Sequence, residues 1–539
     1  MNDKICLIGV NARYSHSNLA VRCLKNALDK HKIPSEIVEL SINDRIEQAV
    51  DALYLKRADF YCFSCYIWNI AMIQEIISEL KRLLPKSRIV LGGPEVSFDN
   101  VEFLKNPDID YIICGEGEKA LPALIKEPAG FPKEIRQEGC VDINAYSCLY
   151  ESVPEHKIIY YETTRGCPFS CSYCLSSTIQ GVRYKALEIV FSEIERLAAQ
   201  GVRLIKFVDR TFNANAERAL AIWKHLAGHY PAICFHFEVG ADLLTPEQLN
   251  FLKTIPEGQF QFEIGIQSTN EETLKAVNRP WDKRKLFSNI QFLVQETQIH
   301  IHLDLIAGLP YEDFAAFLHS FDEVMSLRPH VLQVGFLKML RGCRIREQAE
   351  KYDYVYSKRP PYTVYRNKFL SYDEILELKK IEKMVDKYYN SNCFMHSLTF
   401  ILQQFEKPSD FYWKFGRYHE KNGFLERPVS RRELFRIFLD FYLETDGRQA
   451  ELFCEILRLD YVLCEKSNPS WAQYRSNRDA VVKLLKNEKF KENYGRQVQK
   501  MTVEWFDFNG GMWLLFRDKQ IINISEYINE DGGTQWKKF

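Results

Sequence analysis

The sequence lacks several features that would place a protein outside the ordinary globular class. No run of apolar residues approaches the roughly 18 residues of a membrane-spanning helix, and the N-terminus has no basic, apolar and small-residue leader. The 71 basic and 72 acidic residues nearly cancel, so the net charge of -1 provides no general attraction for nucleic acid. There are no low-complexity tracts and no internal repeats beyond an alternation of strand and helix. We therefore predict a cytoplasmic globular protein with no membrane partner.

Cysteine is plentiful, but its distribution does not indicate a disulfide framework. The 15 cysteines are an odd number scattered over 539 residues, and a reducing cytoplasm disfavours stable disulfides. Most of them lie in apolar runs and are predicted to be small core residues. Cys62 and Cys65 have the spacing of a redox pair, but they fall within a strand-like run and not at a helix N-terminus, which favours core packing.

The first 130 residues predict an α/β domain. Short β-branched runs such as KICLIGV and SRIVLGG alternate with amphipathic stretches such as IAMIQEIISELKRLL. Continuous apolar strands separated by helical periods are typical of a doubly wound, Rossmann-like parallel sheet with helices on both faces. Ligands of such sheets bind beyond the carboxyl ends of the strands. Residues 131–154 contain proline, glycine and lysine and are predicted to be a linker.

Residues 155–358 repeat the alternation of strand and helix. This rhythm predicts a partial (β/α)6 barrel of the TIM type, whose chemistry would lie at the carboxyl ends of its strands. The expected strands are 158–163, 204–209, 233–239, 260–266, 299–308 and 331–337.

Residues 359–539 are predicted to form a mainly helical domain with a few late strands, because charged and aromatic helical periods replace the β-branched runs. Ser371 and Glu374 have the spacing of a capping box, which predicts a helix over residues 372–389.

Three cysteines, Cys167, Cys171 and Cys174, follow the first expected barrel strand with the spacing C-x3-C-x2-C. Soft thiolates select zinc or iron-sulfur clusters. A structural zinc normally has four protein ligands, but neither cysteine nor histidine occurs in the fifty residues after Cys174. A 4Fe-4S cluster held by three thiolates keeps one iron free for another ligand. An incidental zinc loop and a chance group of core cysteines are the alternatives.

This loop, with aromatic Tyr173 before its last cysteine, resembles the signature of the radical S-adenosylmethionine (SAM) enzymes. The resemblance implies that Cys167, Cys171 and Cys174 are catalytic residues that hold the cluster. It also implies that the free iron binds SAM, and that an electron from the cluster cleaves SAM to methionine and a 5'-deoxyadenosyl radical. The reductant would be a protein such as flavodoxin or ferredoxin.

Positions near the ends of later strands match the SAM contacts of this family in barrel order. Glu238 would accept hydrogen bonds from the ribose, and Arg279 would pair with the SAM carboxylate. Asp209 and Arg210 depart from the pattern, because many relatives have two glycines there, which puts the contact with the SAM amino group in doubt. The resemblance assigns SAM binding to Tyr173, Asp209, Glu238, Gln267, Ser268, Arg279, Asp304 and Ala307.

The N-terminal domain resembles the cobalamin-binding domain found in one large branch of the radical SAM enzymes. The resemblance spans residues 4–127 and rests on the motifs S-x-Y-I-W-N, VLGGPEVS and DYIICGEGE. The glycines fit this role, because they remove side chains where the backbone must approach a nucleotide tail. The implied cobalamin contacts are Asn11, Ser64, Tyr66, Gly92, Gly93, Pro94, Glu95, Gly115, Glu116, Gly117 and Glu118.

The lower ligand of cobalt is not specified by a motif. The Asp-x-His-x-x-Gly signature that supplies a histidine in cobalamin mutases is absent, which fits the radical SAM branch. His16 is the nearby candidate ligand, although capping or lining of its loop is the favoured role. A dinucleotide site and a ligand-free scaffold are the alternatives for the domain, but no G-x-G-x-x-G follows Gly9.

Together, the resemblances imply a cobalamin-dependent radical SAM enzyme with a C-terminal domain of unknown function. The leading hypothesis is a methyltransferase that acts on an unactivated carbon through a 5'-deoxyadenosyl radical and methylcobalamin. The alternatives are a redox, cyclisation or rearrangement enzyme with the same cofactors, and a cobalamin-binding sensory protein with an idle barrel.

The substrate is not determined by the sequence and is a small molecule, a peptide or RNA. Aromatic and basic residues in 359–369 and 414–424 support the RNA hypothesis, although such runs are usually solvated helix surface. Cys343, near the expected barrel mouth, is either a structural residue or a hydrogen-donor thiol, and the structural interpretation is favoured.

Overall fold

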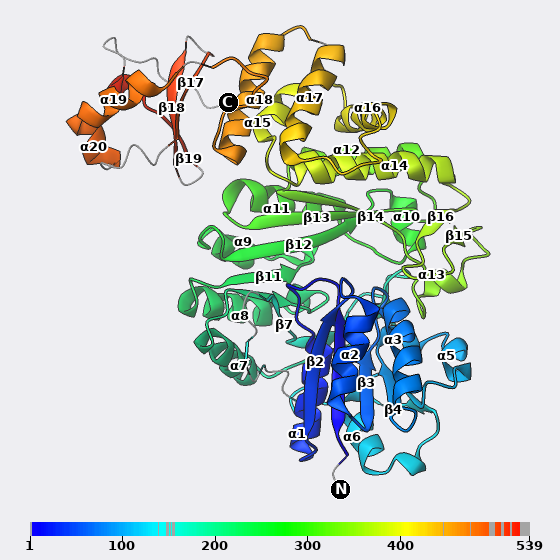
Figure 1. Ribbon diagram of the computed structural model, residues 1–539. Helices are drawn as coiled ribbons and strands as arrows, with labels where there is room; N and C mark the ends of the chain where they lie inside the picture. Colours follow the sequence, from blue (N-terminus) through cyan, green and yellow to red (C-terminus); the bar gives the residue numbers. More distant parts are fainter. Residues whose placement is uncertain are drawn as a thin grey trace. The chain divides into compact units, whose positions relative to one another are not determined.

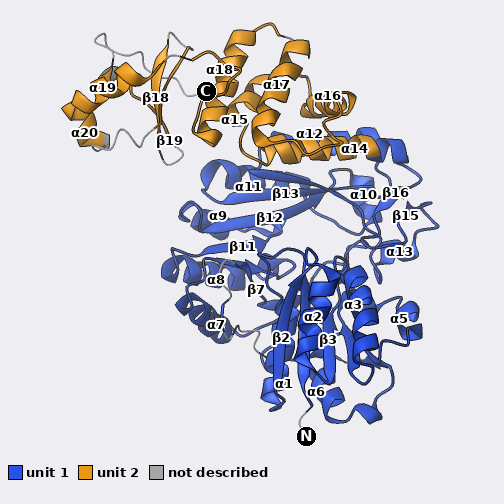
Figure 2. Cartoon of the chain, viewed as in Figure 1, with its two compact units in different colours: residues 1–375 blue, residues 376–539 orange. Residues whose placement is uncertain are grey.

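The computed structural model describes residues 3–528 except 138, 147–149, 151, 154–156, 180, 446, 475, 495–501, 508–510 and 518–519. The chain divides into two compact units, Met1–Ile375 and Leu376–Phe539 (Figure 2). No helix among the described residues is both long enough and apolar enough to cross a membrane. Thirteen described cysteines are free thiols, whereas Cys23 is buried and disulfide-bonded, contrary to the expectation that the cysteines form no disulfide.

The first sheet of unit 1 is parallel throughout, as predicted, with the strand order β2-β1-β3-β4-β5-β6. Its last strand lies within residues 131–154, so part of the expected linker extends the sheet; a strand of three residues is too short to produce a recognisable periodicity. The strands are β1 (Ile5–Asn11), β2 (Ser35–Ser41), β3 (Phe60–Ser64), β4 (Arg88–Gly92), β5 (Tyr111–Cys114) and β6 (Glu134–Arg136).

Helices cover both faces of this sheet (Figure 1). They are α1 (Leu19–Lys30), α2 (Ile46–Lys56), α3 (Ile70–Leu83), α4 (Pro94–Ser97), α5 (Val101–Lys105) and α6 (Gly117–Lys126). α1 and α6 share a hydrophobic core with Leu7 of β1, whereas α2 and α3 share the opposite core with Ile8. Successive side chains of a strand point to opposite faces, so the continuous apolar run of β1 supplies both cores.

The second sheet of unit 1 is also parallel, in the order β14-β13-β12-β11-β10-β7, and contains all six expected strands of the partial barrel. Its strands are β7 (Ile159–Tyr161), β10 (Leu204–Phe207), β11 (Cys234–Glu238), β12 (Phe260–Gln267), β13 (His300–Ala307) and β14 (Val331–Phe336). The connecting helices are α7 (Leu187–Ala199), α8 (Ala216–His229), α9 (Pro246–Leu252), α10 (Glu271–Ala276), α11 (Lys283–Glu296) and α12 (Phe314–Ser326).

A small antiparallel hairpin, which the sequence analysis did not anticipate, interrupts the β/α rhythm after β7. Its strands are β8 (Thr164–Gly166) and β9 (Val182–Tyr184). Gly166 has a φ of +102°, and a Cβ atom there would collide with the carbonyl oxygen of Gly181. The hairpin therefore requires glycine at this position, directly before the cysteine loop.

After β14, the chain forms α13 (Arg344–Glu347) and a short antiparallel pair, β15 (Val355–Tyr356) and β16 (Val364–Arg366). α14 (Tyr372–Met384) then begins where predicted. Ser371 Oγ accepts from the backbone N–H of Glu374, and the Glu374 carboxylate accepts from the N–H of Ser371, which completes the capping box.

The rest of unit 2 is mainly helical and ends in a three-stranded antiparallel sheet, as expected (Figure 1). α14 continues as a π-helical turn, Val385–Tyr389. The following helices are α15 (Met395–Leu402), α16 (Pro408–Lys421), α17 (Arg431–Thr445), α18 (Ala450–Glu465), α19 (Arg478–Lys486) and α20 (Glu488–Tyr494). The strands are β17 (Thr502–Phe506), β18 (Met512–Arg517) and β19 (Gln520–Asn523).

Candidate cluster and cofactor site

The hairpin β8–β9 presents the three cysteines at the carboxyl end of β7. Burial, and to a lesser degree the neighbouring Cys174 and Cys171, raises the pKa of Cys167, which shows that the three thiols lie near one another. Among the described residues, no three histidine, cysteine, aspartate or glutamate side chains converge on the point that a single metal ion would occupy. The loop supplies three free thiols within eight residues, which is the ligand set that the expected iron-sulfur cluster requires.

Arg279 lies against this loop. Its Nη1 is 3.5 Å from the sulfur of Cys171, and its Nη2 donates to the carbonyl oxygen of Gly265 at 2.6 Å. Its Nε is buried without a hydrogen-bond partner. A fixed guanidinium with an unused donor beside the cluster cysteines suits an anionic group of a ligand bound there.

Gln267 and Ser268, both expected to contact SAM, differ in their surroundings. Gln267 has a φ of +72°, and its Oε1 is buried without a hydrogen-bond partner. Ser268 is fully buried, and its hydroxyl donates to Glu312 at 2.5 Å. Glu312 was not expected from the sequence, because it lies five residues after Ala307 and carries no motif of its own.

We predict that Glu312 gives the stability of the protein a measurable pH dependence. Burial raises its pKa to about 7, although hydrogen bonds from Ser268 and Ser320 oppose this shift. As pH rises from about 4.5 to about 7, the unfolded chain releases this proton while the folded chain retains it, so the folded state loses stability. The free energy of unfolding of Glu312→Gln, relative to that of the parent protein, should therefore increase by on the order of 3 kcal/mol from the lower to the upper end of that range.

Urea unfolding of both proteins at the two ends of this pH range tests the prediction. A constant difference in unfolding free energy between Glu312→Gln and the parent would contradict it, because a permanently neutral amide has no proton to lose.

Asp209 is completely buried, and its carboxylate accepts from the backbone N–H and hydroxyl of Thr163 at 3.1 and 2.5 Å. Burial raises the pKa of Asp209 to about 6. The carboxylate thus fixes the chain between β7 and β8, whereas Thr211 after it brings a hydroxyl to 3.7 Å from the sulfur of Cys167. Asp209 therefore has a structural role at a position where the resemblance led us to expect glycine in many relatives.

Glu238, at the end of β11, is half-buried in the same region. Burial raises its pKa to about 7, and Arg210 opposes the shift. Asp304 on β13 lies 3.2 Å from Nε2 of His302, and Ala307 at the end of that strand is fully buried. The charge of Asp304 makes a small further contribution to the raised pKa of Glu238.

The second sheet of unit 1 also carries charged residues that the sequence analysis missed. Glu263 on β12 lies 2.9 Å from Lys206 of β10 and 3.1 Å from Nε2 of His236 on β11. Although burial opposes it, these two partners hold the pKa of Glu263 below its ordinary value. The available signal was the alternation of polar and apolar residues in FQFEIGI and CFHFE, which marks one polar face of each strand.

The turns at the ends of β4 and β5 depend on glycine. Gly93 has a φ of +112°, and a Cβ atom there would lie 2.5 Å from the carbonyl oxygen of Cys65. A Cβ atom on Gly117 would lie 2.9 Å from Leu24 of α1, and Gly115 has a φ of +91°. These glycines let the strand-end turns pack closely, and Gly92 and Pro94 belong to the same β4–α4 connection.

The carboxyl ends of β1 and β3 carry three residues that are expected to contact cobalamin, Asn11, Ser64 and Tyr66. Asn18 donates to Oδ1 of Asn11 at 3.3 Å and to the hydroxyl of Ser64 at 3.2 Å. Tyr66 stacks on Trp68 with ring centroids 4.4 Å apart. The carboxyl end of this sheet therefore presents small polar groups, two aromatic rings and glycine-containing turns, and such a surface suits a large polar cofactor.

Family models match three parts of the chain. A B12 binding domain matches residues 5–125, the radical SAM superfamily matches residues 161–324, and a family described as protein of unknown function (DUF4080) matches residues 350–508. The chain joins a B12-binding domain to a radical SAM domain. Cobalamin, SAM and a 4Fe-4S cluster are the cofactors of this combination, and the geometry of the cysteine loop and strand-end turns fits them.

Relatives with assigned names match part of the chain. The cobalamin-dependent radical SAM methyltransferase TokK of Streptomyces tokunonensis is 25% identical over an alignment 331 residues long, and the match covers 52% of this chain and 47% of TokK. The 2-(S-pantetheinyl)-carbapenam-3-carboxylate methyltransferase of Streptantibioticus cattleyicolor is 25% identical over an alignment 320 residues long, and the match covers 50% of this chain and 45% of that enzyme. The chain thus spans about half the length of the curated relatives it matches.

Two solved structures share the fold. TsrM from Kitasatospora setae, with cobalamin and a [4Fe-4S] cluster bound, has a TM-score of 0.56 and 18% identity, covering 65% of this chain and 78% of TsrM. OxsB, a cobalamin-dependent S-adenosylmethionine radical enzyme with aqua-cobalamin bound, has a TM-score of 0.59 and 14% identity, covering 85% of this chain and 79% of OxsB.

Three carboxylates that were expected to contact cobalamin reach arginines outside the B12-binding domain. Glu95 accepts from Nε of Arg341 at 3.1 Å and from the hydroxyl of Tyr362, in the segment that follows the radical SAM strands. Glu116 and Glu118 pair with arginines of the hairpin β8–β9 in the radical SAM domain. The carboxylates therefore join the two domains of unit 1, and their expected contact with cobalamin stays a prediction.

His16 and Cys343 also have partners. Nδ1 of His16 lies 3.3 Å from the hydroxyl of Tyr160 on β7, and burial lowers the pKa of His16. Cys343 is fully buried, and its thiol donates to the carbonyl oxygen of Tyr173 at 3.3 Å. Burial raises the pKa of Cys62 and Cys65, which supports their interpretation as core thiols.

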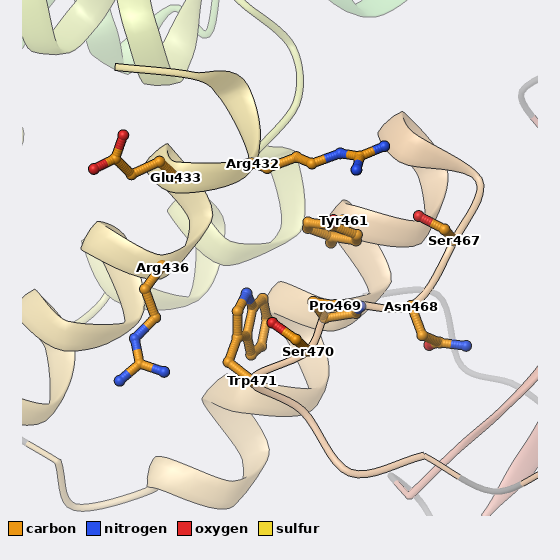
Figure 3. Close-up of a pocket in the computed structure, with 9 residues that line it drawn as sticks. All are labelled: Arg432, Glu433, Arg436, Tyr461, Ser467, Asn468, Pro469, Ser470 and Trp471. Atoms are coloured by element: carbon orange, nitrogen blue, oxygen red, sulfur yellow. The ribbon is translucent and has the colours of Figure 1, made fainter. Parts of the chain in front are cut away.

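Unit 2 contains a surface cavity of about 570 Å³ between α17, α18 and the following loop (Figure 3). Tyr461 and Trp471 meet edge to face there with centroids 6.1 Å apart, and Arg432 is paired with Glu465 at 2.7 Å. The segments behind the RNA hypothesis lie elsewhere; of their aromatic residues, Tyr362, Phe415 and His419 are buried, whereas Tyr365 is exposed. These three rings are therefore not presented for stacking on bases.

Proposed function

We propose that the chain is a cobalamin-dependent radical SAM methyltransferase that acts on an unactivated carbon. The observation that carries the proposal is the cysteine loop, which extends from the radical SAM strands and is held at its base by carboxylates of the B12-binding domain. The substrate class, a small molecule, a peptide or RNA, is open. A flavodoxin or ferredoxin is the proposed reductant, and the cytoplasm is the proposed compartment, because reducing conditions suit the three free thiols of the cysteine loop.

The chain's own residues account for binding and orientation. Cys167, Cys171 and Cys174 would hold the cluster, and Arg279 would orient the SAM carboxylate with its buried, unused Nε. When bound, the cluster and SAM supply one-electron chemistry, and cobalamin carries the methyl group. Cys171 is only 4% exposed and Tyr173 is largely buried, so the loop excludes water from its inner side.

Glu238 and Gln267 would complete the SAM site. With its pKa raised to about 7, Glu238 can either donate or accept a hydrogen bond to the ribose near neutral pH. The buried Oε1 of Gln267 needs a donor, and SAM offers its amino group and hydroxyls. The names of TokK and the carbapenam methyltransferase support methyl transfer as the reaction.

Methyl transfer is tested with SAM that carries an isotopic label in its methyl group. Anaerobically reconstituted full-length protein is incubated with metabolite, peptide and RNA fractions from a strain that lacks it. We expect label in a product that the parent strain contains and the deletion strain lacks. Cys171→Ala should yield no labelled product.

The other outcomes separate the alternatives. Reductive SAM cleavage and substrate turnover without transfer of label would replace methyl transfer by redox or rearrangement chemistry. Cobalamin binding without any SAM cleavage would favour the sensory protein.

A further inference from the structure

Arg165 connects the cysteine loop to the B12-binding domain. It stands two residues before Cys167, on β8, and its Nη2 lies 2.9 Å from Oε1 of Glu118. Its Nη1 lies 3.5 Å from Oε1 of Glu116. Nη2 is also 2.8 Å from Oε2 of Glu162, just after β7. These side chains are largely buried, so solvent screens their interaction less than that of surface pairs.

Arg183 places a second positive charge directly across the hairpin. In the register of β8 and β9, Arg165 and Arg183 are paired residues. Like charges at directly opposed positions destabilise a β-ribbon, and an isolated two-stranded hairpin is marginal in water. The hairpin therefore needs an anion between its arginines.

Glu116 supplies that anion. Its Oε2 accepts from Nη1 of Arg183 at 3.1 Å, and its Oε1 pairs with both arginines. The same carboxylate accepts the backbone N–H of Val141 at 2.7 Å, which fixes its position. The stability of the hairpin, and hence the placement of the first cluster cysteine, depends on a residue of the B12-binding domain.

Glu116 also belongs to a turn at which cobalamin is expected. It stands between Gly115 and Gly117, at the carboxyl end of β5, where a doubly wound sheet binds its ligand. A ligand that orders this turn would hold Glu116 and Glu118 in their arginine-binding positions. One turn thus lies where cobalamin is expected and also pairs with the arginines at the base of the cysteine loop.

We propose that Glu116, Glu118, Arg165 and Arg183, named here the arginine clamp, are positioning residues that couple cobalamin binding to the ordering of the cysteine loop. The inference rests on the proposed function in so far as the domain binds cobalamin. Because coupling is reciprocal, a well-formed hairpin also strengthens cobalamin binding.

Hydrogen exchange in the full-length protein without its cluster tests the coupling, with hydroxocobalamin as the probe. Hydroxocobalamin should slow the exchange of amides in residues 167–179 of the parent protein. Glu116→Gln keeps the shape of the side chain but removes the carboxylate that lies between the two arginines, so Arg183 loses its carboxylate partner, whereas Arg165 keeps Glu118 and Glu162. This variant should lose that protection and bind hydroxocobalamin at least about fivefold more weakly.

Two further variants make the test specific. Glu116→Gln combined with Arg183→Gln removes the repulsion across the hairpin, and it should regain protection of residues 182–184 relative to Glu116→Gln alone. Glu247→Gln removes an exposed partner of Lys224 in the same unit and should match the parent protein in both measurements. The double variant also distinguishes loss of the clamp from a general failure to fold.

The outcomes separate this inference from the proposed function. If the parent protein binds hydroxocobalamin but exchange in residues 167–179 does not change, the coupling is wrong and the cofactor assignment stands. Parent-like binding and exchange in Glu116→Gln would also overturn the coupling. If the parent protein does not bind hydroxocobalamin, both the coupling and the cobalamin part of the proposed function fail.

Discussion

Cys171→Ala is expected to abolish assembly of the 4Fe-4S cluster and, with it, reductive cleavage of SAM. Three thiols are available in the loop, and Cys171 is the most buried of them, so its loss removes one of three anchors and opens the inner side to water. Even changes around metal ligands cost about 10- to 100-fold in affinity or activity, and removal of a ligand should exceed that range. Anaerobic iron and sulfide analysis, visible absorbance and release of methionine from SAM measure the effect.

Cys343→Ala is the matched control for this variant. Cys343 is equally buried and donates to the carbonyl oxygen of Tyr173 in the same loop, but it is not one of the three proposed ligands. We expect it to retain iron, sulfide and the absorbance of the cluster. Cluster content in Cys171→Ala equal to that of the control would contradict the assignment of the loop.

Lys185→Met is expected to destabilise the folded protein by about 3–5 kcal/mol, because it leaves a buried carboxylate without its cation. Lys185, just after β9, is 2% exposed, and its Nζ lies 2.7 Å from Oε2 of Glu193 on α7. The hydroxyl of Tyr161 donates to the same oxygen at 2.6 Å. The pair therefore links the residue that follows β9 to α7, the first helix of the radical SAM domain.

Urea unfolding of the parent protein and three variants measures this effect. Lys185→Met combined with Glu193→Gln should recover much of the lost stability, because the remaining amide carries no charge and can still accept from Tyr161. Lys224→Met, which breaks an exposed pair with Glu247, should change stability by less than about 1 kcal/mol. Equal free energies of unfolding for Lys185→Met and Lys224→Met would contradict the prediction, because the buried pair would then contribute no more stability than the exposed pair.

Much of the fold was predictable from the sequence because its signals are local. The apolar run of β1 and the polar and apolar alternation of β12 each identify a strand without reference to any other part of the chain. The capping box at Ser371 likewise lies within four residues. The short strands β6, β8 and β9 were missed, because three residues do not establish a period and their pairing partners are not local.

The sequence by itself determined the order of the domains and the loop with three cysteines and Tyr173. It also determined every strand of the two parallel sheets apart from β6. These features depend on residue type and spacing over short distances. Only the tertiary structure decided which polar side chains are committed to partners. Glu95, Glu116 and Glu118 bind arginines distant in sequence, and Ser268 is held by Glu312, because an ion pair or hydrogen bond depends on proximity in space, which spacing along the chain does not encode.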